Sequence, residues 1–580
     1  MQDALARIDE LLEEFLGWLA RRPALSAAFL IALCLALHLP GSSSLPVTDR
    51  DEARFAQATK QMLETGDFID IRFQEEPRYK KPIGIYWLQA VAVSVFSPDD
   101  LTQIWAYRIP SLIGIIAAVL LTWWAARPLF GRQAALLAAI LLAGAFTLTL
   151  EARIAKSDGV LLAFTVLAMG ALARIYMFRR KRQEMVTIAA VFWIALGLGI
   201  LIKGPVAPSL AVLTMIPIVI FDKDRSWLKN LHAAWGIPVM LAITLPWFIA
   251  IGVVSDWEFF RLAFGEDFFA KLQGGREKHW GPPGFYFIVF WWSFWPATLV
   301  STGGAALWLW RHRLNRRALF LLSWVIPFWL VLEATPTKLP HYAMVLYPAI
   351  AMGAAWVLRK ATMAGRVPMR TYKQAAAIWL FVAALQLAFL LFLHAWFWIM
   401  PSLWLIPAAA AIIGLSWATF RASWSGHFHA GIGLAILTAF FVYTAAFKLV
   451  LPAIDPLWIS RQAAELVGTL RPCISSPVIL TSYREPSAVF LLGTDTAMMA
   501  PEQANRVLSE GKAELALMDK HTADNLPLVD PAPRPIACVE GFNMNGGNHL
   551  HLQLMTARPE KVFTSCPVPE RYRCKTADGQ

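Results

Sequence analysis

Long apolar segments alternate with short polar ones over most of the chain. About thirteen of these segments approach the roughly twenty residues with which a helix spans a bilayer. In chain order they are Ala24–Pro40, Tyr107–Ala126, Gln133–Leu150, Gly159–Phe178, Met185–Ile202, Pro205–Phe221, Ala233–Val254, Phe285–Trp310, Ala318–Leu332, Tyr342–Leu358, Ala375–Phe392, Leu403–Phe420 and Ala430–Leu451. The pattern predicts a polytopic α-helical membrane protein with about thirteen transmembrane helices, formed by residues 24–451.

Residues 1–23 follow a different pattern. Leu5, Ile8, Leu12 and Phe15 recur at the spacing of one helix face, and acidic residues occupy positions between them. This spacing predicts an amphipathic helix on the cytoplasmic membrane surface. Because no small-residue cleavage site follows, we expect the first span to remain as an anchor.

Residues 452–580 are less apolar and predict a C-terminal α/β domain. Helices are expected at Ile459–Leu470 and near Glu502–Leu508, and strands at Pro477–Thr481, near Glu514–Met518 and on both sides of Asn545-Gly546-Gly547. Four of the five cysteines lie in this domain, namely Cys473, Cys538, Cys566 and Cys574. Their spacing does not match a zinc site and predicts two disulfides in an oxidising compartment, with all three pairings open.

The composition narrows the class of protein. The chain is 57% hydrophobic and 16% charged, which excludes a soluble cytosolic enzyme. Its net charge of +12 would suggest a nucleic-acid partner in a soluble protein, but here the basic clusters fall in alternate loops, as the positive-inside rule expects. No Asn-x-Ser/Thr sequon occurs, which favours a bacterial inner membrane. Residues 41–106, 255–284 and the C-terminal domain are then predicted to be periplasmic.

Ionisable side chains gather at the outer ends of the predicted helices. They are Asp49, Asp51, Glu52, Arg54, Lys80, Lys81, Glu151, Arg153, Lys156, Asp158, Lys203, Lys338, His341 and Tyr342. Carboxylates, cations and a phenol on one membrane face suit an anionic headgroup, with carboxylates left for proton transfer. Any one of them alone is explained as a solvated loop residue. Lys203 and Lys338, however, occupy very short outer turns, where basic residues are uncommon.

A polytopic transporter is the alternative from another class. It should place polar residues near the bilayer midplane on broken helices, and its halves should repeat. No convincing internal repeat is seen, and the charges lie at helix ends. These features favour an enzyme.

One group of motifs resembles a known superfamily. The stretches Asp51-Glu52-Ala53-Arg54-Phe55-Ala56, Gly66-Asp67 and Tyr79-Lys80-Lys81-Pro82, with Tyr86-Trp87, resemble the first outer loop of the aminoarabinose transferase and protein O-mannosyltransferase superfamily. The resemblance continues through Asp158, Lys203-Gly204-Pro205 and Thr337-Lys338-Leu339-Pro340-His341-Tyr342. Members of this superfamily are GT-C glycosyltransferases, which transfer a sugar from a polyprenyl-phosphate carrier to an acceptor outside the cytoplasm.

The resemblance implies a role for each matching residue. Asp51 would be the catalytic carboxylate that accepts the acceptor's proton in an inverting displacement, and Asp158 would be the second carboxylate. The residues implied in donor-phosphate binding are Lys81, Lys203, Lys338, Tyr342 and Arg54. Loops 41–106 and 255–284 would form the rim of the active site.

One position departs from the family pattern. Aminoarabinose transferases carry a Glu linked with a metal where this chain has Lys80, and His279 lies where a downstream His would fall. This difference argues against a divalent metal cofactor, and the metal requirement stays open. Glu52, Lys80 and His279 are candidates for acceptor or metal binding, and a more cationic pocket favours an acidic sugar or a phosphorylated acceptor.

The sequence therefore predicts a polyprenyl-phosphate-sugar-dependent hexosyl- or pentosyltransferase. Its expected partners are the undecaprenyl-phosphate-type donor, the membrane and an envelope acceptor, with lipid A or lipopolysaccharide core favoured and no nucleic acid. Protein O-glycosylation and lipid or solute transport are the alternatives. The identity of the sugar is not specified.

Overall fold

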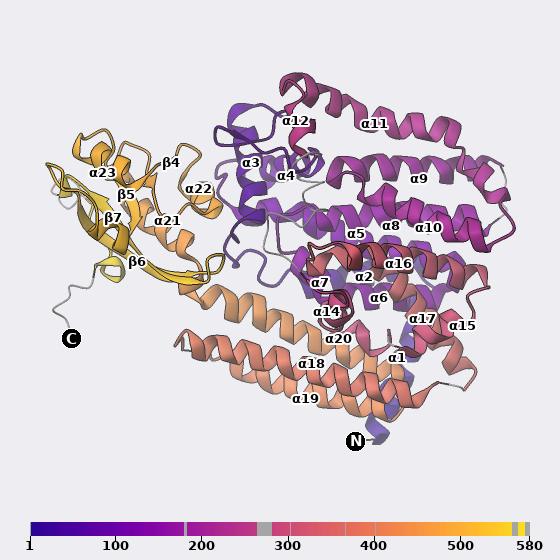
Figure 1. Cartoon of the computed structure of the whole chain (residues 1–580). Helices are drawn as coiled ribbons and strands as arrows, with labels where there is room; N and C mark the ends of the chain where they lie inside the picture. Colours follow the sequence, from indigo (N-terminus) through magenta and orange to yellow (C-terminus); the bar gives the residue numbers. More distant parts are fainter. Residues whose placement is uncertain are drawn as a thin grey trace.

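The computed structural model describes residues 2–178, 182–263, 281–301, 303–365, 367–400, 402–559 and 566–574. A large helical body carries a smaller domain with a β-sheet at its C-terminal end (Figure 1). This arrangement confirms the predicted polytopic helical protein with a C-terminal α/β domain.

Nine helices of the described residues are long and apolar enough to cross a membrane. They are α5 (Ile104–Phe130), α8 (Asp158–Met177), α9 (Arg182–Lys203), α11 (Ala233–Val254) with the turn before it, α16 (Arg316–Ala334), α17 (Tyr347–Met363) with the turn before it, α18 (Met369–Trp396), α19 (Leu405–Trp424) and α20 (Phe428–Thr444) with its extension to Ala453. Three shorter apolar helices are α4 (Gly84–Phe96), α6 (Arg132–Gly144) and α10 (Val206–Phe221). The chain is thus a multi-pass membrane protein, and the number of crossings remains a prediction.

Two expected spans are not single helices, and these predictions were wrong. The segment Phe285–Trp310 forms two short helices, α14 (Phe285–Ser293) and α15 (Gly303–Arg311), with a 3-10 turn at Ala297–Leu299. Pro296 lies between them and has no N–H to continue a helix. The segment Gln133–Leu150 is divided at Ala145 into α6 and α7 (Phe146–Glu151), because the Ala145 backbone is extended (φ −58°, ψ 131°).

The N-terminal segment forms the expected helix. Helix α1 (Gln2–Ala20) makes an angle of 120° with α2 (Pro23–His38) and packs against α20. The backbone N–H of Ala430 donates to Asp9 Oδ1 at 2.8 Å, which ties α1 to the start of α20. Its position on the membrane surface remains a prediction.

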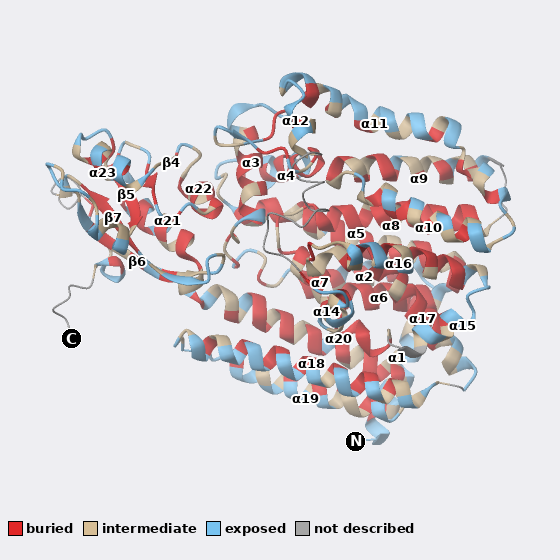
Figure 2. Ribbon diagram, in the orientation of Figure 1, coloured by how far each residue is buried: buried red, intermediate tan, exposed pale blue. Residues whose placement is uncertain are grey.

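Burial follows the expected membrane arrangement. Buried residues fill the centre of the helical body, whereas exposed positions concentrate on its outer helices, such as α11, α18 and α19 (Figure 2). Many of these exposed side chains are large and apolar, including Phe381 and Ile406. Apolar side chains on the outside of a helix bundle are suited to contact with lipid.

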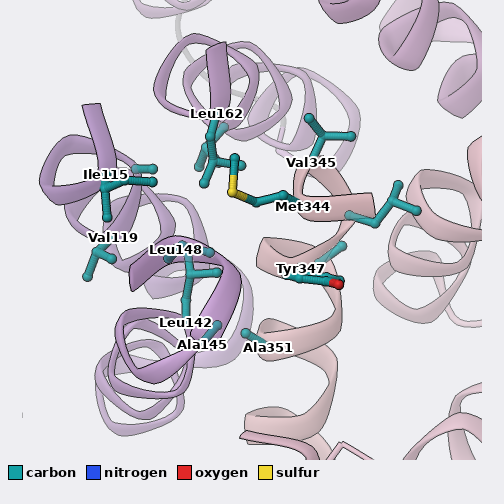
Figure 3. Packing of buried hydrophobic residues seen from close by; sticks show 14 of the residues in the cluster. Ile115, Val119, Leu142, Ala145, Leu148, Leu162, Met344, Val345, Tyr347 and Ala351 are labelled. Carbon is teal, nitrogen blue, oxygen red and sulfur yellow. The ribbon is translucent and has the colours of Figure 1, made fainter. Parts of the chain in front are cut away.

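The central core joins the helices that end near the candidate site. Ile115 of α5, Leu148 of α7, Leu162 of α8 and Tyr347 of α17 belong to one buried cluster (Figure 3). Helices α5 and α8 approach closely at Gly114 and Gly159, where a Cβ on Gly114 would lie 2.6 Å from the Gly159 carbonyl carbon. This packing fixes the start of α8, at Asp158, against α5.

The two predicted outer loops contain further helices. The first loop forms α3 (Asp51–Thr65), the short strands β1 (Arg72–Phe73) and β2 (Glu76–Pro77), and α4. The second loop begins with α12 (Glu258–Phe260). Residues 264–280 of this loop, which was predicted to form part of the active-site rim, lie outside the described residues.

The C-terminal domain has a five-stranded mixed sheet in the order β4-β3-β5-β7-β6. Its strands are β3 (Ile479–Leu480), β4 (Ala497–Met498), β5 (Ala516–Asp519), β6 (Arg534–Asn543) and β7 (Asn548–Thr556). Strands β4, β3 and β5 pair in parallel, whereas β5–β7 and β6–β7 are antiparallel. Its helices are α21 (Ile459–Leu470), α22 (Pro486–Leu492), α23 (Pro501–Ser509) and α24 (Lys520–Asp524).

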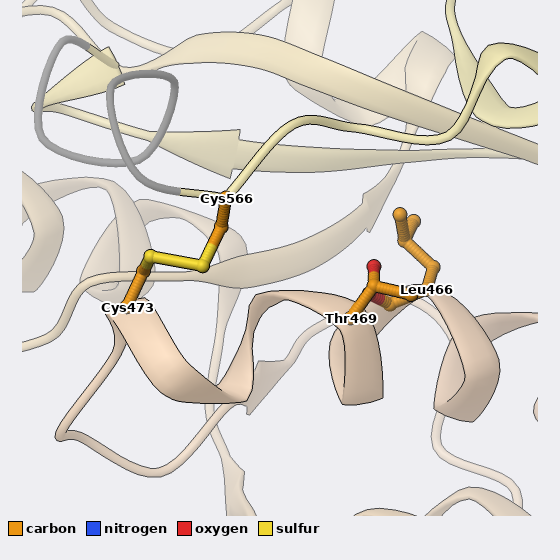
Figure 4. Close-up of a disulfide and its surroundings, with 4 residues drawn as sticks. All are labelled: Leu466, Thr469, Cys473 and Cys566. Carbon is orange, nitrogen blue, oxygen red and sulfur yellow. A yellow bond between two sulfur atoms is a disulfide. The ribbon is translucent and has the colours of Figure 1, made fainter.

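Two disulfides hold this domain together, as predicted. Cys473 pairs with Cys566, and Cys538 pairs with Cys574 (Figure 4 shows the first). The fifth cysteine, Cys34, is free and buried in α2. Both bonds attach the last described segment of the chain to the body of the domain.

Candidate active site

A cluster of charged side chains lies where α7 ends and α8 begins. Glu151 ends α7, Asp158 begins α8, and Lys156 lies in the turn between them. Lys156 Nζ is 3.8 Å from Glu151 Oε1. Burial lowers the pKa of Lys156, but the nearby carboxylates Glu151 and Asp158 outweigh this effect and hold the pKa above its usual value.

Two other segments contribute basic side chains to this cluster. Lys203, the last residue of α9, donates from Nζ to Asp158 Oδ1 at 2.5 Å. His341, in the turn before α17, lies between the two carboxylates, with Nδ1 3.6 Å from Glu151 and Nε2 3.9 Å from Asp158. Segments almost two hundred residues apart therefore meet at one end of the bundle.

Tyr342 lies beside this cluster. Its ring packs edge-on against His341, and Lys203 Nζ lies 5.5 Å from the Tyr342 ring centroid. The structure thus brings together three of the predicted site residues, Asp158, Lys203 and Tyr342.

Asp51 is the first residue of α3 and is exposed. Partial desolvation raises the pKa of its carboxyl, but the positive charges of Lys156 and Arg78, followed by Arg54, hold the pKa below its usual value. Asp51 is therefore ionised at neutral pH. These interactions place Asp51 within electrostatic range of Lys156.

The side chain of Glu52, the neighbour of Asp51, contacts Arg108 of α5. Its carboxylate forms a bidentate pair with Arg108 of α5 at 2.8 and 2.9 Å, and both side chains are almost fully buried. The same carboxylate accepts hydrogen bonds from Thr48 and from the Ala155 backbone. These contacts occupy its acceptor positions and join α3 to α5 and to the turn before α8. The predicted contact of Glu52 with an acceptor or a metal remains a prediction.

Lys338 is placed differently from the prediction. Its ammonium donates to the carbonyls of Glu333 at 2.7 Å and Thr335 at 2.8 Å, with a longer contact to Leu332. These carbonyls end α16 and have no partner within the helix. Lys338 is buried and caps this helix, so the expected contact with donor phosphate is not supported.

The other predicted residues lie around the cluster or beyond the described chain. Arg54 is half-buried on α3, one turn after Asp51. Lys80 is exposed and Lys81 is half-buried, just before α4. His279 lies outside the described residues. The roles of Arg54, Lys80, Lys81 and His279 remain predictions.

Sequence reasoning gave no role to four residues that shape the site. Glu151, Lys156 and His341 were recognised only as outer charges. Arg78 is buried and lies 4.9 Å above the Phe55 ring, which places its charge near Asp51. Its position just before Tyr79-Lys80-Lys81 was the only available signal.

Helix α3 also contacts the C-terminal domain. Lys60 Nζ donates to the Phe490 carbonyl at 3.0 Å, and Gln57 donates to Thr494 Oγ1 at 2.8 Å. The Phe490 ring is fully buried and packs edge-on against Tyr107 of α5. The helix that presents Asp51 is therefore held between the membrane helices and α22.

The cluster can perform acid–base and phosphate chemistry. A low-pKa carboxylate, two lysines, an arginine and a phenol surround one region, which suits an anionic leaving group and proton transfer from an acceptor. Among the residues that the structure describes, no three His, Cys, Asp or Glu side chains are grouped to hold a metal ion.

Comparisons with known proteins point to one superfamily. The family profile described as dolichyl-phosphate-mannose-protein mannosyltransferase matches residues 80–249. Undecaprenyl phosphate-alpha-4-amino-4-deoxy-L-arabinose arabinosyl transferase 1 of Pseudomonas fluorescens is 28% identical over 325 residues, which cover 54% of this chain and 56% of that protein. The corresponding arabinosyl transferase of Yersinia pestis is 27% identical over 327 residues, which cover 55% of this chain and 57% of that protein. The chain thus matches only about half the length of these curated relatives.

Solved structures share the fold over most of the chain. ArnT from Cupriavidus metallidurans, bound to undecaprenyl phosphate, aligns with a TM-score of 0.73 at 18% identity and covers 93% of this chain and 98% of ArnT. The oligosaccharyltransferase AglB from Archaeoglobus fulgidus aligns with a TM-score of 0.51 at 12% identity, and the alignment covers 91% of this chain and 74% of AglB. These similarities establish the overall fold.

Proposed function

We propose that this chain, which belongs to the aminoarabinose transferase and protein O-mannosyltransferase superfamily of GT-C proteins, transfers a sugar from a polyprenyl-phosphate donor to an envelope acceptor. The observation that carries the proposal is the meeting of Asp51 with the cluster of Lys156, Asp158, Lys203 and His341 at one end of the membrane helices. A lipid-linked donor would reach such a site from the bilayer.

Asp51 is proposed as the catalytic base. Its ionised carboxylate accepts the proton of the acceptor hydroxyl as the hydroxyl oxygen attacks the anomeric carbon. The bond between the anomeric carbon and the phosphate oxygen breaks, and its electron pair leaves with polyprenyl phosphate. A single displacement of this kind inverts the anomeric configuration.

Lys203 is proposed to hold the donor phosphate. An ammonium has three N–H donors, and Asp158 occupies one of them. The others can reach a phosphate oxygen and stabilise the charge that develops on the leaving group. We assign Asp158 to orienting Lys203, and Tyr342, Lys81 and Arg54 to the same phosphate pocket.

The favoured acceptor is lipid A or lipopolysaccharide core. This choice is supported by the names of the aminoarabinose transferases that resemble the chain. Protein hydroxyls are the second candidate, because the matching family profile is described as a protein mannosyltransferase. The cationic surroundings of Asp51 are compatible with either a phosphorylated lipid or an acidic sugar.

We also propose a periplasmic active site and a three-part organisation. The two disulfides of the C-terminal domain indicate an oxidising compartment, and this domain contacts α3 beside Asp51. Residues 1–23 would form the cytoplasmic surface helix, residues 24–451 the catalytic membrane domain, and residues 452–580 the periplasmic domain.

Release of polyprenyl phosphate tests the proposal. Purified protein is incubated with a panel of polyprenyl-phosphate sugars and an envelope lipid extract, beside Asp51→Asn and the exposed control Asp99→Asn. Release by the native chain and the control, but not by Asp51→Asn, is expected. Release that persists in Asp51→Asn would remove the base assignment, and no release from any donor by folded protein would favour a transporter.

A further inference from the structure

A second cationic site lies at the opposite end of the membrane helices from Asp51. A cavity of about 380 Å³ is lined by Trp124, Arg127, Pro128, Arg132 and Arg174. None of these lining residues is acidic. The cavity shares no residue with the cluster at the start of α8.

Its depth in the membrane follows from helix geometry. Arg127 follows Arg108 by nineteen residues on α5, which corresponds to about 28 Å along the helix axis. Arg174 follows Asp158 by sixteen residues on α8, or about 24 Å. The hydrocarbon core of a bilayer is about 30 Å thick, so the cavity lies at the headgroup level of the other leaflet.

The arginines are held in fixed orientations. The Arg174 guanidinium is buried, donates to the carbonyls of Gly170 and Trp124, and stacks 3.4 Å from the Trp124 ring centroid. Arg127 lies 4.9 Å from the Trp123 ring centroid. Neither Arg127 nor Arg132 forms an ion pair with any carboxylate in the described part of the chain. Their charge is therefore available to an external anion.

We propose that this cavity binds the headgroup of an anionic membrane phospholipid. Guanidinium groups bind phosphate through paired hydrogen bonds, and the phosphodiester of a bilayer lipid lies at this depth. Basic pockets between transmembrane helices are suited to such headgroups. The apolar faces of Trp123 and Trp124 would contact the glycerol and upper acyl region. This site is separate from the proposed donor site and does not depend on transferase activity.

Lipid titration by native mass spectrometry tests the site on the purified full chain. The probes are phosphatidylglycerol, phosphatidylcholine, undecaprenyl phosphate and inorganic phosphate. The test variant is Arg127→Ala/Arg132→Ala, and Arg174 is left intact because it is part of the packed structure. The matched control is Arg313→Ala/Arg317→Ala, two exposed arginines beside Arg316, which pairs with Asp222 at the same end of the bundle.

The native chain should bind phosphatidylglycerol more tightly than phosphatidylcholine. Loss of two arginines should weaken phosphatidylglycerol binding roughly 30-fold, at about 1 kcal/mol for each basic residue near a membrane surface. The control should bind as the native chain does, and both variants should keep the native melting temperature in phosphatidylcholine.

Three results would overturn the proposal. They are equal affinity for the two phospholipids, unchanged phosphatidylglycerol binding in Arg127→Ala/Arg132→Ala, or an equal loss in the control. Preferential binding of undecaprenyl phosphate or of inorganic phosphate at these arginines would reassign the site to that anion and would likewise exclude a phospholipid headgroup.

Discussion

Ser487, near the start of α22, donates a hydrogen bond from Oγ to Asp49 Oδ1, two residues before Asp51 in the sequence. Ser487 is itself linked to Ser460, which contacts Tyr483 at 2.8 Å. Between Asp49 and Asp51, Arg50 adopts a positive φ of 63°, a conformation that L residues rarely adopt. The C-terminal domain thus holds the strained turn that begins α3.

Removal of this contact should slow sugar transfer. Ser487→Ala frees Asp49 and loosens the turn that presents Asp51, so we expect turnover to fall up to about tenfold with little change in the donor KM. Single-turnover transfer measures the effect. Ser482→Ala, an exposed serine of the same domain, is the matched control. A changed donor KM with normal turnover would show that Ser487 does not act through Asp51.

The stability of the protein should depend on the ionisation of Asp49, the acceptor in this contact. Burial raises the pKa of Asp49 from 3.8 to about 6, and the nearby charge of Glu485 adds to this, whereas the hydrogen bond from Ser487 and the charge of Arg50 oppose it. Because the folded pKa is raised, the contribution of Asp49 to stability is fully present below about pH 4 and is lost as the pH rises through 6. The melting temperature of the native chain should therefore fall across this range relative to Asp49→Asn. Parallel pH profiles for the two proteins would contradict the raised pKa.

Sequence patterns predicted the secondary-structure elements better than they predicted contacts between distant residues. The apolar periodicity of Ile459–Leu470 matched α21 to the residue, because a local amphipathic pattern determines a local helix. The pairing of Glu52 with Arg108, and of Asp49 with Ser487, joins residues distant in sequence, and no local pattern specifies such contacts. Hydropathy also treated Phe285–Trp310 as one span, since it does not register the missing N–H of Pro296.

Lys203 and Lys338 both occupy short outer turns in the sequence, but their substitution should have different effects. Lys203→Met removes a cation beside Asp158 and should weaken binding of polyprenyl phosphate about 10- to 100-fold. Lys338→Met removes a cap from α16, so it should lower the melting temperature and leave donor affinity unchanged. Calorimetric titration and thermal unfolding separate the two effects, and Lys203→Arg should restore part of the binding. Weakened donor binding by a stably folded Lys338→Met would return Lys338 to the phosphate pocket.

The buried pair of Glu52 and Arg108 should be a stability determinant. Arg108 donates to both carboxylate oxygens and to the carbonyls of Ser42, Leu45 and Pro46, so it joins α5 to the loop before α3. Arg108→Ala leaves a buried carboxylate without its cation, and we expect a loss of about 3–5 kcal/mol in the free energy of unfolding. Denaturant titration in detergent measures this loss. Arg108→Ala with Glu52→Gln should recover part of it, because the uncompensated charge is then removed. If the double variant is no more stable than Arg108→Ala, the hydrogen bonds of Arg108 to the loop carbonyls, and not its charge, hold α3 in place.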